Sequence, residues 1–460
     1  MSAAVDRSVR PASEAPRRLV LPRFESGRHP DPGGLDVRFA RRRGVPEVSL
    51  RLILEAGAVG EPARHAGLAA LTARLLTEGT SDRDAIEVAR WLDRLGIGFH
   101  ASAGHAVGVL SIHTLTDVFE EALEFLAAVA RSPTFPDHEV DRVRQERLDE
   151  IAREIDEPAV VANHALIATL FGEGLYGRPV RGTHASVSAI EPDDIRAFHA
   201  ARYRPGGGSL YVCGDVDDDR VRAGVEHWLG HWQGEARRPD APVTPPAPEP
   251  SVLLIDRPGS AQAEVRVGAI GVPYGTPDHH AIVLANALLG GLFNSRINMN
   301  LREDKGWTYG ARSSFRFRRG AGPFVVQTAV ETGVTTDAIE EILMEIERMR
   351  NDLVTGDELD MAKHALALSL PLQFETPEQI TARVSRQAIY DLGDDYWESY
   401  GARLEAVTAE DVREACRTYL ARERLTLLAV TDAGAVAGTL SRLGPVERRS
   451  VDGTAIVASS

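Results

Sequence analysis

Apolar residues near the start of the chain follow first the period of a strand and then the period of a helix. Between Glu47 and Ala56 they occupy every second position, which predicts a strand with one buried face. Over residues 67–80 leucines recur at positions 68, 71, 75 and 76, and Gly79 provides a stop signal. The pattern therefore predicts an apolar-striped helix soon after the strand.

The same two periods predict the elements that follow, up to residue 214. We expect a helix capped near Ser81 or Asp82 that ends at Gly96. Two strands, 98–103 and 107–115, should follow with a turn between them. The remaining predicted elements are helices over 117–131, 137–156, 159–171 and 192–201, a loop over 172–183 and a strand over 208–214. Together they indicate an α+β unit, a sheet covered by helices.

A proline-rich stretch separates this unit from a second one with the same order of elements. Residues 235–251 contain six prolines and no apolar period, which is typical of an extended linker. Residues 190–215 align without a gap with residues 407–432, which indicates a duplication. Beyond the linker we expect strands over 263–270, 310–318 and 323–330, and helices over 279–289, 294–303 and 336–353.

These patterns divide the chain into four parts. We expect a flexible arm over 1–20, an N-terminal domain over 21–234, the linker over 235–251 and a C-terminal domain over 252–460. The boundaries rest mainly on the composition of the linker.

Composition narrows the possible partners and compartments. The 460 residues carry a formal net charge of −15, which argues against a nucleic-acid partner and against an anionic membrane surface. No apolar run approaches the ~20 residues that span a bilayer. Two distant cysteines, Cys213 and Cys416, indicate buried thiols in a reducing compartment. The N-terminal residues bear Arg and Ser, as transit peptides do, but Asp6 and Glu14 argue against that interpretation, and we expect a cytoplasmic bacterial protein.

The predicted helix at 67–80 also carries a candidate motif. Its frame, Gly-Leu-Ala followed by Gly-Thr, resembles the surroundings of the inverted zinc motif His-x-x-Glu-His in the pitrilysin and mitochondrial processing peptidase family, the inverzincins. Ala70 and Arg74 stand at the two histidine positions, and Ala73 stands at the glutamate position. The duplicated halves and the loop at 177–183 also resemble this family. Together with the helix frame, they extend the resemblance from about residue 35 to residue 445.

The resemblance implies a fold and a degenerate metal site. Members of the family have two homologous α+β domains, each with a mostly antiparallel sheet and helices on one face, and two chains form a clamshell around a chamber. Glu146 matches the family's later zinc-ligand position, and Glu150, one turn on, is the runner-up. One carboxylate cannot hold catalytic zinc, and Arg74 would repel the ion, so no metal is expected in this chain. Glu146 is either a vestige paired with Arg74 or an ordinary solvated carboxylate.

The second half resembles the family elsewhere. Arg302 and Tyr309, seven residues apart, match the Arg/Tyr pair that holds the substrate backbone near the scissile bond from across the chamber. Guanidinium and phenol donors of this kind can stabilise an oxyanion. The alternative is a surface arginine near a helix C-terminus and a tyrosine packed on the sheet.

The leading hypothesis is a zinc-free subunit of a heterodimeric metallopeptidase that acts on peptides. Its partner would be a homologous chain that carries His-x-x-Glu-His and the zinc. A structural or binding protein derived from the peptidase fold is the alternative, and an enzyme with relocated metal ligands is a third. His279 and His280 begin a predicted helix, and we expect them in solvent.

Overall fold

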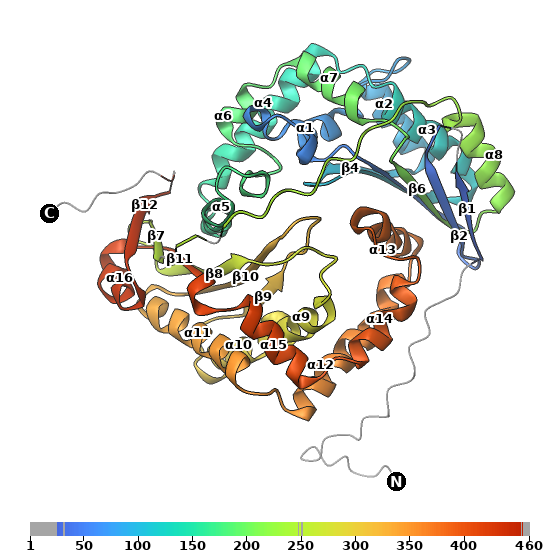
Figure 1. The fold of residues 1–460 in the computed structure, drawn as a ribbon. Helices are drawn as coiled ribbons and strands as arrows, with labels where there is room; N and C mark the ends of the chain where they lie inside the picture. Colours follow the sequence, from blue (N-terminus) through green and yellow to red (C-terminus); the bar gives the residue numbers. More distant parts are fainter. Residues whose placement is uncertain (1–24, 31–32, 247, 250–251, 452, 454–460) are drawn as a thin grey trace, which may run out of the picture.

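The computed structural model describes residues 25–30, 33–246, 248–249, 252–451 and 453. The predicted arm, residues 1–20, lies outside these ranges. The described chain forms two halves, each built on a six-stranded sheet, and Figure 1 shows the halves facing one another. The α+β fold of two similar halves expected from the sequence is confirmed.

The first sheet has the strand order β1-β2-β6-β3-β5-β4. Only β2 and β6 run parallel, and every other neighbouring pair is antiparallel. The strands are β1 (Glu25–Pro30), β2 (Asp36–Arg41), β3 (Glu47–Leu54), β4 (Gly98–Ala103), β5 (Gly108–Leu115) and β6 (Ser209–Gly214).

The second sheet repeats this topology in the order β12-β7-β11-β8-β10-β9. Its inner five strands match β2-β6-β3-β5-β4 in order and direction, with β7 and β11 as the parallel pair. The outermost strand differs, because β12 pairs with β7 in parallel. The strands are β7 (Val252–Asp256), β8 (Gln262–Ile270), β9 (Ala311–Phe315), β10 (Pro323–Glu331), β11 (Thr426–Thr431) and β12 (Val446–Ser450).

Helices other than α5 (Pro158–Phe171) and α13 (Pro377–Tyr390) cover the outer face of each sheet and enclose its main core. In the first half they are α1 (Leu68–Leu75), α2 (Ala85–Leu95), α3 (Phe119–Arg131), α4 (Asp137–Glu154), α6 (His184–Ser188), α7 (Pro192–Arg202) and α8 (Asp218–Leu229). In the second they are α9 (His279–Asn286), α10 (Arg296–Asn298), α11 (Thr335–Asn351), α12 (Gly356–Ser369), α14 (Tyr396–Glu405), α15 (Ala409–Tyr419) and α16 (Ala433–Leu440). No helix in these described segments is long and apolar enough to cross a bilayer.

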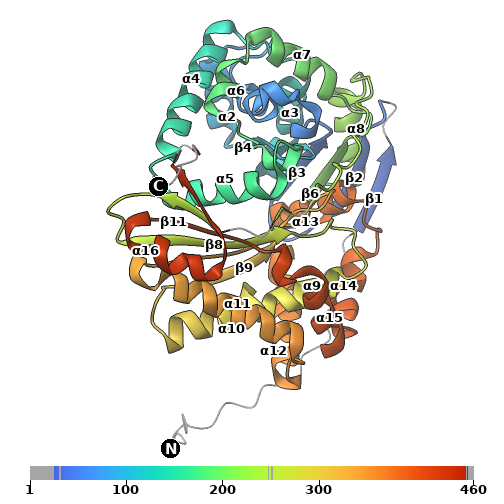
Figure 2. The ribbon, with the colours of Figure 1, turned by 60° about the vertical axis from the view of Figure 1, so that its left-hand side comes forward.

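Two helices are exchanged between the halves. Helix α5 packs on β8 and β11 of the second sheet, and α13 packs on β3 and β6 of the first. Figures 1 and 2 show both helices in the space between the sheets. Leu166 and Leu170 of α5 join a buried cluster with Leu428 of β11. Each half therefore covers the inner face of the other.

The structure corrects several predicted boundaries. Helix α2 is capped by Asp84 and not by Ser81 or Asp82, because the Asp84 carboxylate and the Glu87 side chain form a reciprocal capping box. The helix predicted over 279–289 leaves the α form after Asn286 and continues as a π-helical turn over 287–291. A side chain at Gly290 would meet the Ser313 backbone nitrogen at 2.6 Å, so this turn lies directly against β9.

Two further expectations also change. The helix predicted over 294–303 is a short α-turn, α10, followed by a π-helical segment over 299–304. His279 is not in solvent, because it is only 6% exposed and its ring stacks on Tyr274 with centroids 4.7 Å apart. The sequence placed it correctly at a helix start, but two of the aromatic residues around it, Phe317 and Tyr396, come from distant segments.

Candidate functional site

Helix α1 begins where residues 67–80 and the loop at 177–183 meet, the two segments of the first half that resemble the family. Its N-cap residue, Gly67, has φ +102°, a value that favours glycine. A side chain there would meet the Gly182 Cα at 3.0 Å and the Arg181 carbonyl oxygen at 3.1 Å. The start of α1 is therefore fixed against the loop that contains residues 177–183.

Glu61, which the sequence interpretation missed, also fixes the start of α1. Its carboxylate accepts hydrogen bonds from the Gly67 and Ala69 backbone N–H groups at 3.1 and 2.9 Å. Burial raises the pKa of Glu61 to about 7, although these hydrogen bonds and the charge of Arg178 act in the opposite direction. The sequence offered one signal for this role, an isolated acidic residue shortly before an apolar helix, where a carboxylate can bind the free N–H groups of the helix start.

The three degenerate positions lie on α1 opposite α4. Ala73 is buried, and neither it nor Ala70 offers a ligand atom. Arg74 reaches α4, where its Nη2 donates to Glu146 Oε2 at 2.7 Å and its Nη1 donates to Glu150 Oε1 at 2.9 Å. The expected pairing of Arg74 with Glu146 is present, and Glu150 shares the same guanidinium.

Further arginines surround these carboxylates. Although burial opposes it, the hydrogen bond and charge of Arg74 lower the pKa of Glu150. Arg142 donates to Glu146 at 2.7 Å, and Arg181 contacts Glu150. The network comprises Arg74, Arg142, Arg147 and Arg181 with Glu78, Glu139, Glu146, Glu150 and Glu154.

This composition does not fit a catalytic zinc ion, which takes three protein ligands. Among the residues of the described ranges, no group of three or more His, Cys, Asp or Glu side chains is arranged to hold a metal ion. The carboxylates near α1 are instead neutralised by the protein's own cations.

Arg302 lies in the second half, in the π-helical segment 299–304. Its guanidinium carbon is 4.4 Å from the centre of the Phe293 ring, and its Nη1 is 3.5 Å from Glu303 Oε1. Nη1 is buried from solvent and makes no hydrogen bond with any residue that the structure describes. Arg302 thus retains an unused donor.

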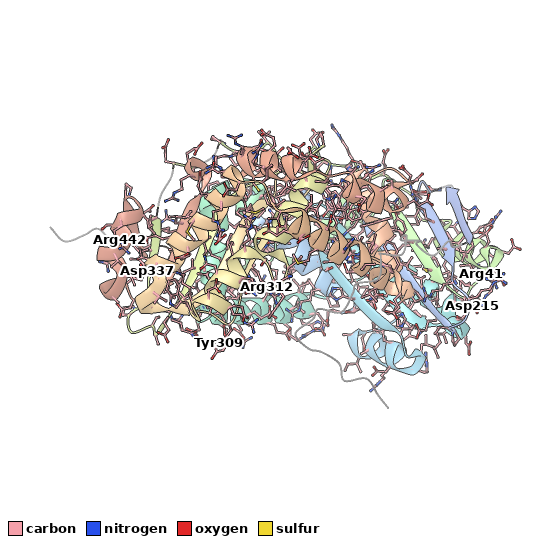
Figure 3. The ribbon with its side chains drawn as sticks, turned by 90° about the horizontal axis from the view of Figure 1, so that it is seen from below. Arg41, Asp215, Tyr309, Arg312, Asp337 and Arg442 are labelled. Atoms are coloured by element: carbon pink, nitrogen blue, oxygen red, sulfur yellow. The ribbon has the colours of Figure 1, made fainter. Side chains whose placement is uncertain are left out.

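Tyr309 is 97% exposed and lies at the edge of the molecule in Figure 3. The backbone on its C-terminal side is fixed, because the Ala311 N–H donates to Asn298 Oδ1 at 3.1 Å. Thr308 and Gly310 are linked by hydrogen bonds of 3.0 and 3.1 Å. The alternative of a tyrosine packed on the sheet is wrong, and no hydrogen bond joins Tyr309 to Arg302 within the described part of the chain.

The fold and the site define a class. The chain has two similar α+β halves, and the positions on its first helix that match a zinc motif hold no metal-ligand residues. Comparison with family profiles agrees, because residues 39–184 match the profile described as Insulinase (Peptidase family M16) and residues 189–366 match Peptidase M16 inactive domain. The chain belongs to the M16 peptidase family, and it is a non-catalytic, peptidase-like member.

Individual relatives extend over most of the chain. An uncharacterized zinc protease of Mycobacterium tuberculosis is 27% identical over 414 residues, which cover 89% of this chain and 92% of the relative. An uncharacterized zinc protease of Streptomyces coelicolor is 26% identical over 402 residues, 85% of this chain and 86% of the relative.

Solved structures show the same fold. A peptidase M16 inactive domain from Pseudomonas fluorescens has a TM-score of 0.83 and 26% identity, and covers 89% of this chain and 98% of that chain. A protease from Helicobacter pylori has a TM-score of 0.84 at 17% identity, with coverage of 89% and 99%.

Proposed function

We propose that this chain is the zinc-free subunit of a heterodimeric metallopeptidase, and that Arg302 and Tyr309 position a peptide at the active site of its partner. The partner would be a homologous chain that carries His-x-x-Glu-His and the zinc. One observation carries the proposal: Tyr309 is 97% exposed beside a fixed backbone, and no residue that the structure describes bonds to its hydroxyl.

The two side chains have suitable chemistry. A phenol O–H and a guanidinium N–H can both donate to a peptide carbonyl oxygen, and these bonds strengthen as negative charge develops on that oxygen. The Phe293 ring lies 4.4 Å from the guanidinium carbon of Arg302, and this contact would restrict the guanidinium before a peptide binds. This chain would therefore bind and orient, and the partner would supply the water-activating group.

The substrates would be peptides or unfolded segments small enough to enter a chamber between two chains. In a bacterial cytoplasm these include leader peptides of modified natural products. The unpaired, buried thiols of Cys213 and Cys416 suit such a reducing compartment.

Purification of the chain alone and with its partner tests the proposal. Alone, it should contain no stoichiometric zinc by elemental analysis and should not cleave a library of fluorogenic unfolded peptides. Addition of a chain with His-x-x-Glu-His, sought among the neighbouring genes, should produce zinc-dependent cleavage. Cleavage by the isolated chain, or full cleavage by the partner without this chain, would contradict the proposal.

A further inference from the structure

A cavity of about 300 Å³ lies where the linker meets the second half. The linker contributes its walls near Arg238 and Asp240, and the connection between β9 and β10 contributes Arg318. Tyr390 and Asp391, at the end of α13, complete it together with Tyr274. The cavity is at the lower end of the volume range of small-molecule sites.

Two of the three arginines at this cavity already have acidic partners. Arg319 donates two hydrogen bonds of 2.7 Å to Glu55, and Arg238 donates one of 2.5 Å to Asp391. Their charges are therefore balanced within the protein.

Arg318 is the exception. It has no carboxylate within ion-pair distance in the described ranges, and its buried Nη1 has no hydrogen-bond acceptor there. Its guanidinium carbon lies 4.5 Å from the centre of the Tyr176 ring. That contact supplies no hydrogen-bond acceptor in the plane of the guanidinium, so Nη1 remains a free donor among the described residues.

Arg318 lies close to a second cation, Arg316. Burial, together with the neighbouring Arg316 and against the effect of Tyr176, lowers the pKa of Arg318 to about 10. Burial and the charges of Arg318 and Arg178 lower the pKa of His105 to about 3, so this histidine is neutral. A buried cation without a counter-ion is costly, and an anionic ligand would remove that cost.

The remaining walls indicate which anion. The rings of Tyr274 and Tyr390 stack with centroids 4.4 Å apart and contribute aromatic surface to a lining that is otherwise mainly polar. Asp391 is already paired with Arg238, but the Asp240 carboxylate would repel a dianion such as phosphate. One uncompensated guanidinium beside this acid matches a single negative charge, and the aromatic surface matches an apolar side chain next to it.

We propose that this cavity binds the C-terminal carboxylate of a short peptide, with the carboxylate on Arg318 and the last side chain against Tyr274 and Tyr390. The tight packing around the connection fixes this arrangement. A side chain at Gly320 would meet the Pro242 carbonyl oxygen at 3.0 Å and the Tyr176 ring at 3.1 Å, and Tyr176 Oη accepts from the Gly320 N–H at 2.9 Å.

Calorimetric titration of the full chain, without any partner, tests the proposal. The probes are acetyl-alanyl-phenylalanine with a free carboxylate, the same dipeptide as its C-terminal amide, and inorganic phosphate. The acid should bind saturably with a Kd of about 1 mM or below. The amide should bind roughly 10- to 100-fold more weakly, because it loses a charged hydrogen bond, and phosphate should not compete.

Variants locate the site. Arg318→Gln should weaken acid binding by a similar factor, whereas Arg312→Gln, at an exposed position on β9 (Figure 3), should not change it. Asp240→Asn, at an exposed linker position, should tighten binding of the free-carboxylate dipeptide a few-fold by removing a repulsive charge. This variant tests the site even if Arg318→Gln does not fold.

Several outcomes would overturn the proposal. They are equal binding of acid and amide, tighter binding of phosphate, no saturable binding of the acid, an equal loss in Arg312→Gln, or no effect of Asp240→Asn. Because no partner is present, none of them depends on the role of Arg302 and Tyr309.

Discussion

Arg74 replaces a metal ligand with a charge of the metal's own sign. It occupies the position of a histidine in the family motif and donates to both Glu146 and Glu150. Its side chain and that of Glu146 are 40% and 43% exposed, so the pair contributes little to stability. Its main effect is chemical, because the carboxylates that remain are already neutralised.

Restoration of the motif tests this interpretation. The triple variant Ala70→His, Ala73→Glu and Arg74→His should bind about one zinc per chain, since it joins two imidazoles to the carboxylates on α4. Arg74→His alone should bind none, and adding Glu146→Gln and Glu150→Gln to the triple variant should abolish binding. Elemental analysis after dialysis against zinc measures this, and a folded triple variant without zinc would show that α1 and α4 do not keep a metal-site geometry.

The candidate site was only partly predictable at this scale. Arg302, Tyr309 and Glu146 follow from motif positions, which are local in sequence. The ring contact of Phe293 with Arg302 and the hydrogen bonds of Glu61 to the start of α1 could not be predicted. Both residues lie in loops, and the path of a loop is not specified by any apolar periodicity. Arg318 was missed for the same reason, since its isolation from carboxylates exists only after folding.

At the scale of elements, the exchange of α5 and α13 joins the two halves. A buried ionic contact between the halves accompanies it. Glu55, directly after β3, and Arg319, between β9 and β10, are 6% and 8% exposed and form a bidentate pair.

Arg319→Met should lower the free energy of unfolding by about 3–5 kcal/mol, because it leaves the Glu55 carboxylate buried without that partner. The control is Arg442→Met, which removes a pair with Asp337 whose side chains are 54% and 51% exposed (Figure 3), and it should change stability by less than about 1 kcal/mol. Urea unfolding measures both. Equally small losses of stability in Arg319→Met and Arg442→Met would contradict this prediction and would mean that water reaches the Glu55 carboxylate.

Most elements were predictable from periodicity, and the exchange was not. Strand β3 and helices α3, α4 and α7 start where the apolar pattern starts. The strand differs from the prediction in one respect, because α13 also buries its second face. Helix α5 is apolar over most of its length, which indicates burial on several sides but cannot say which sheet covers it. The π-helical turns have no recognised sequence period either.

At the scale of the whole molecule, buried histidines make stability depend on pH. Burial lowers the pKa of His105 and His279 to about 3 and that of His199 and His280 to about 4, from an ordinary value of 6.5. The unfolded chain therefore binds more protons than the folded chain below pH 6.5.

We expect the free energy of unfolding to fall as the pH drops below about 6.5, and to do so until the folded-state values are reached. Each histidine contributes a slope of up to about 1.4 kcal/mol per pH unit. Glu61, with a raised pKa of about 7, acts oppositely but is a single group. Urea unfolding between pH 7.5 and 5 measures the trend, His279→Gln should reduce the slope, and a flat profile would contradict burial of the neutral rings.

The degenerate metal site on α1 and the segment with Arg302 and Tyr309 are complementary features of the whole molecule. They lie in different halves of a duplicated chain. Tyr309 is exposed to solvent, whereas Arg74 occupies a metal-ligand position and binds the Glu146 carboxylate. The proposed role of this chain in a site shared with a partner requires both features.

The most direct test is the turnover of the reconstituted complex with Tyr309→Phe. Loss of the hydroxyl should lower kcat by about 10²–10³, while the mass of the complex and its zinc content stay unchanged. Tyr419→Phe, which removes a hydroxyl bonded to Asp278 at 2.6 Å, is the matched control and should keep full turnover. Unchanged turnover with Tyr309→Phe would contradict the central claim and favour a purely structural role for this chain.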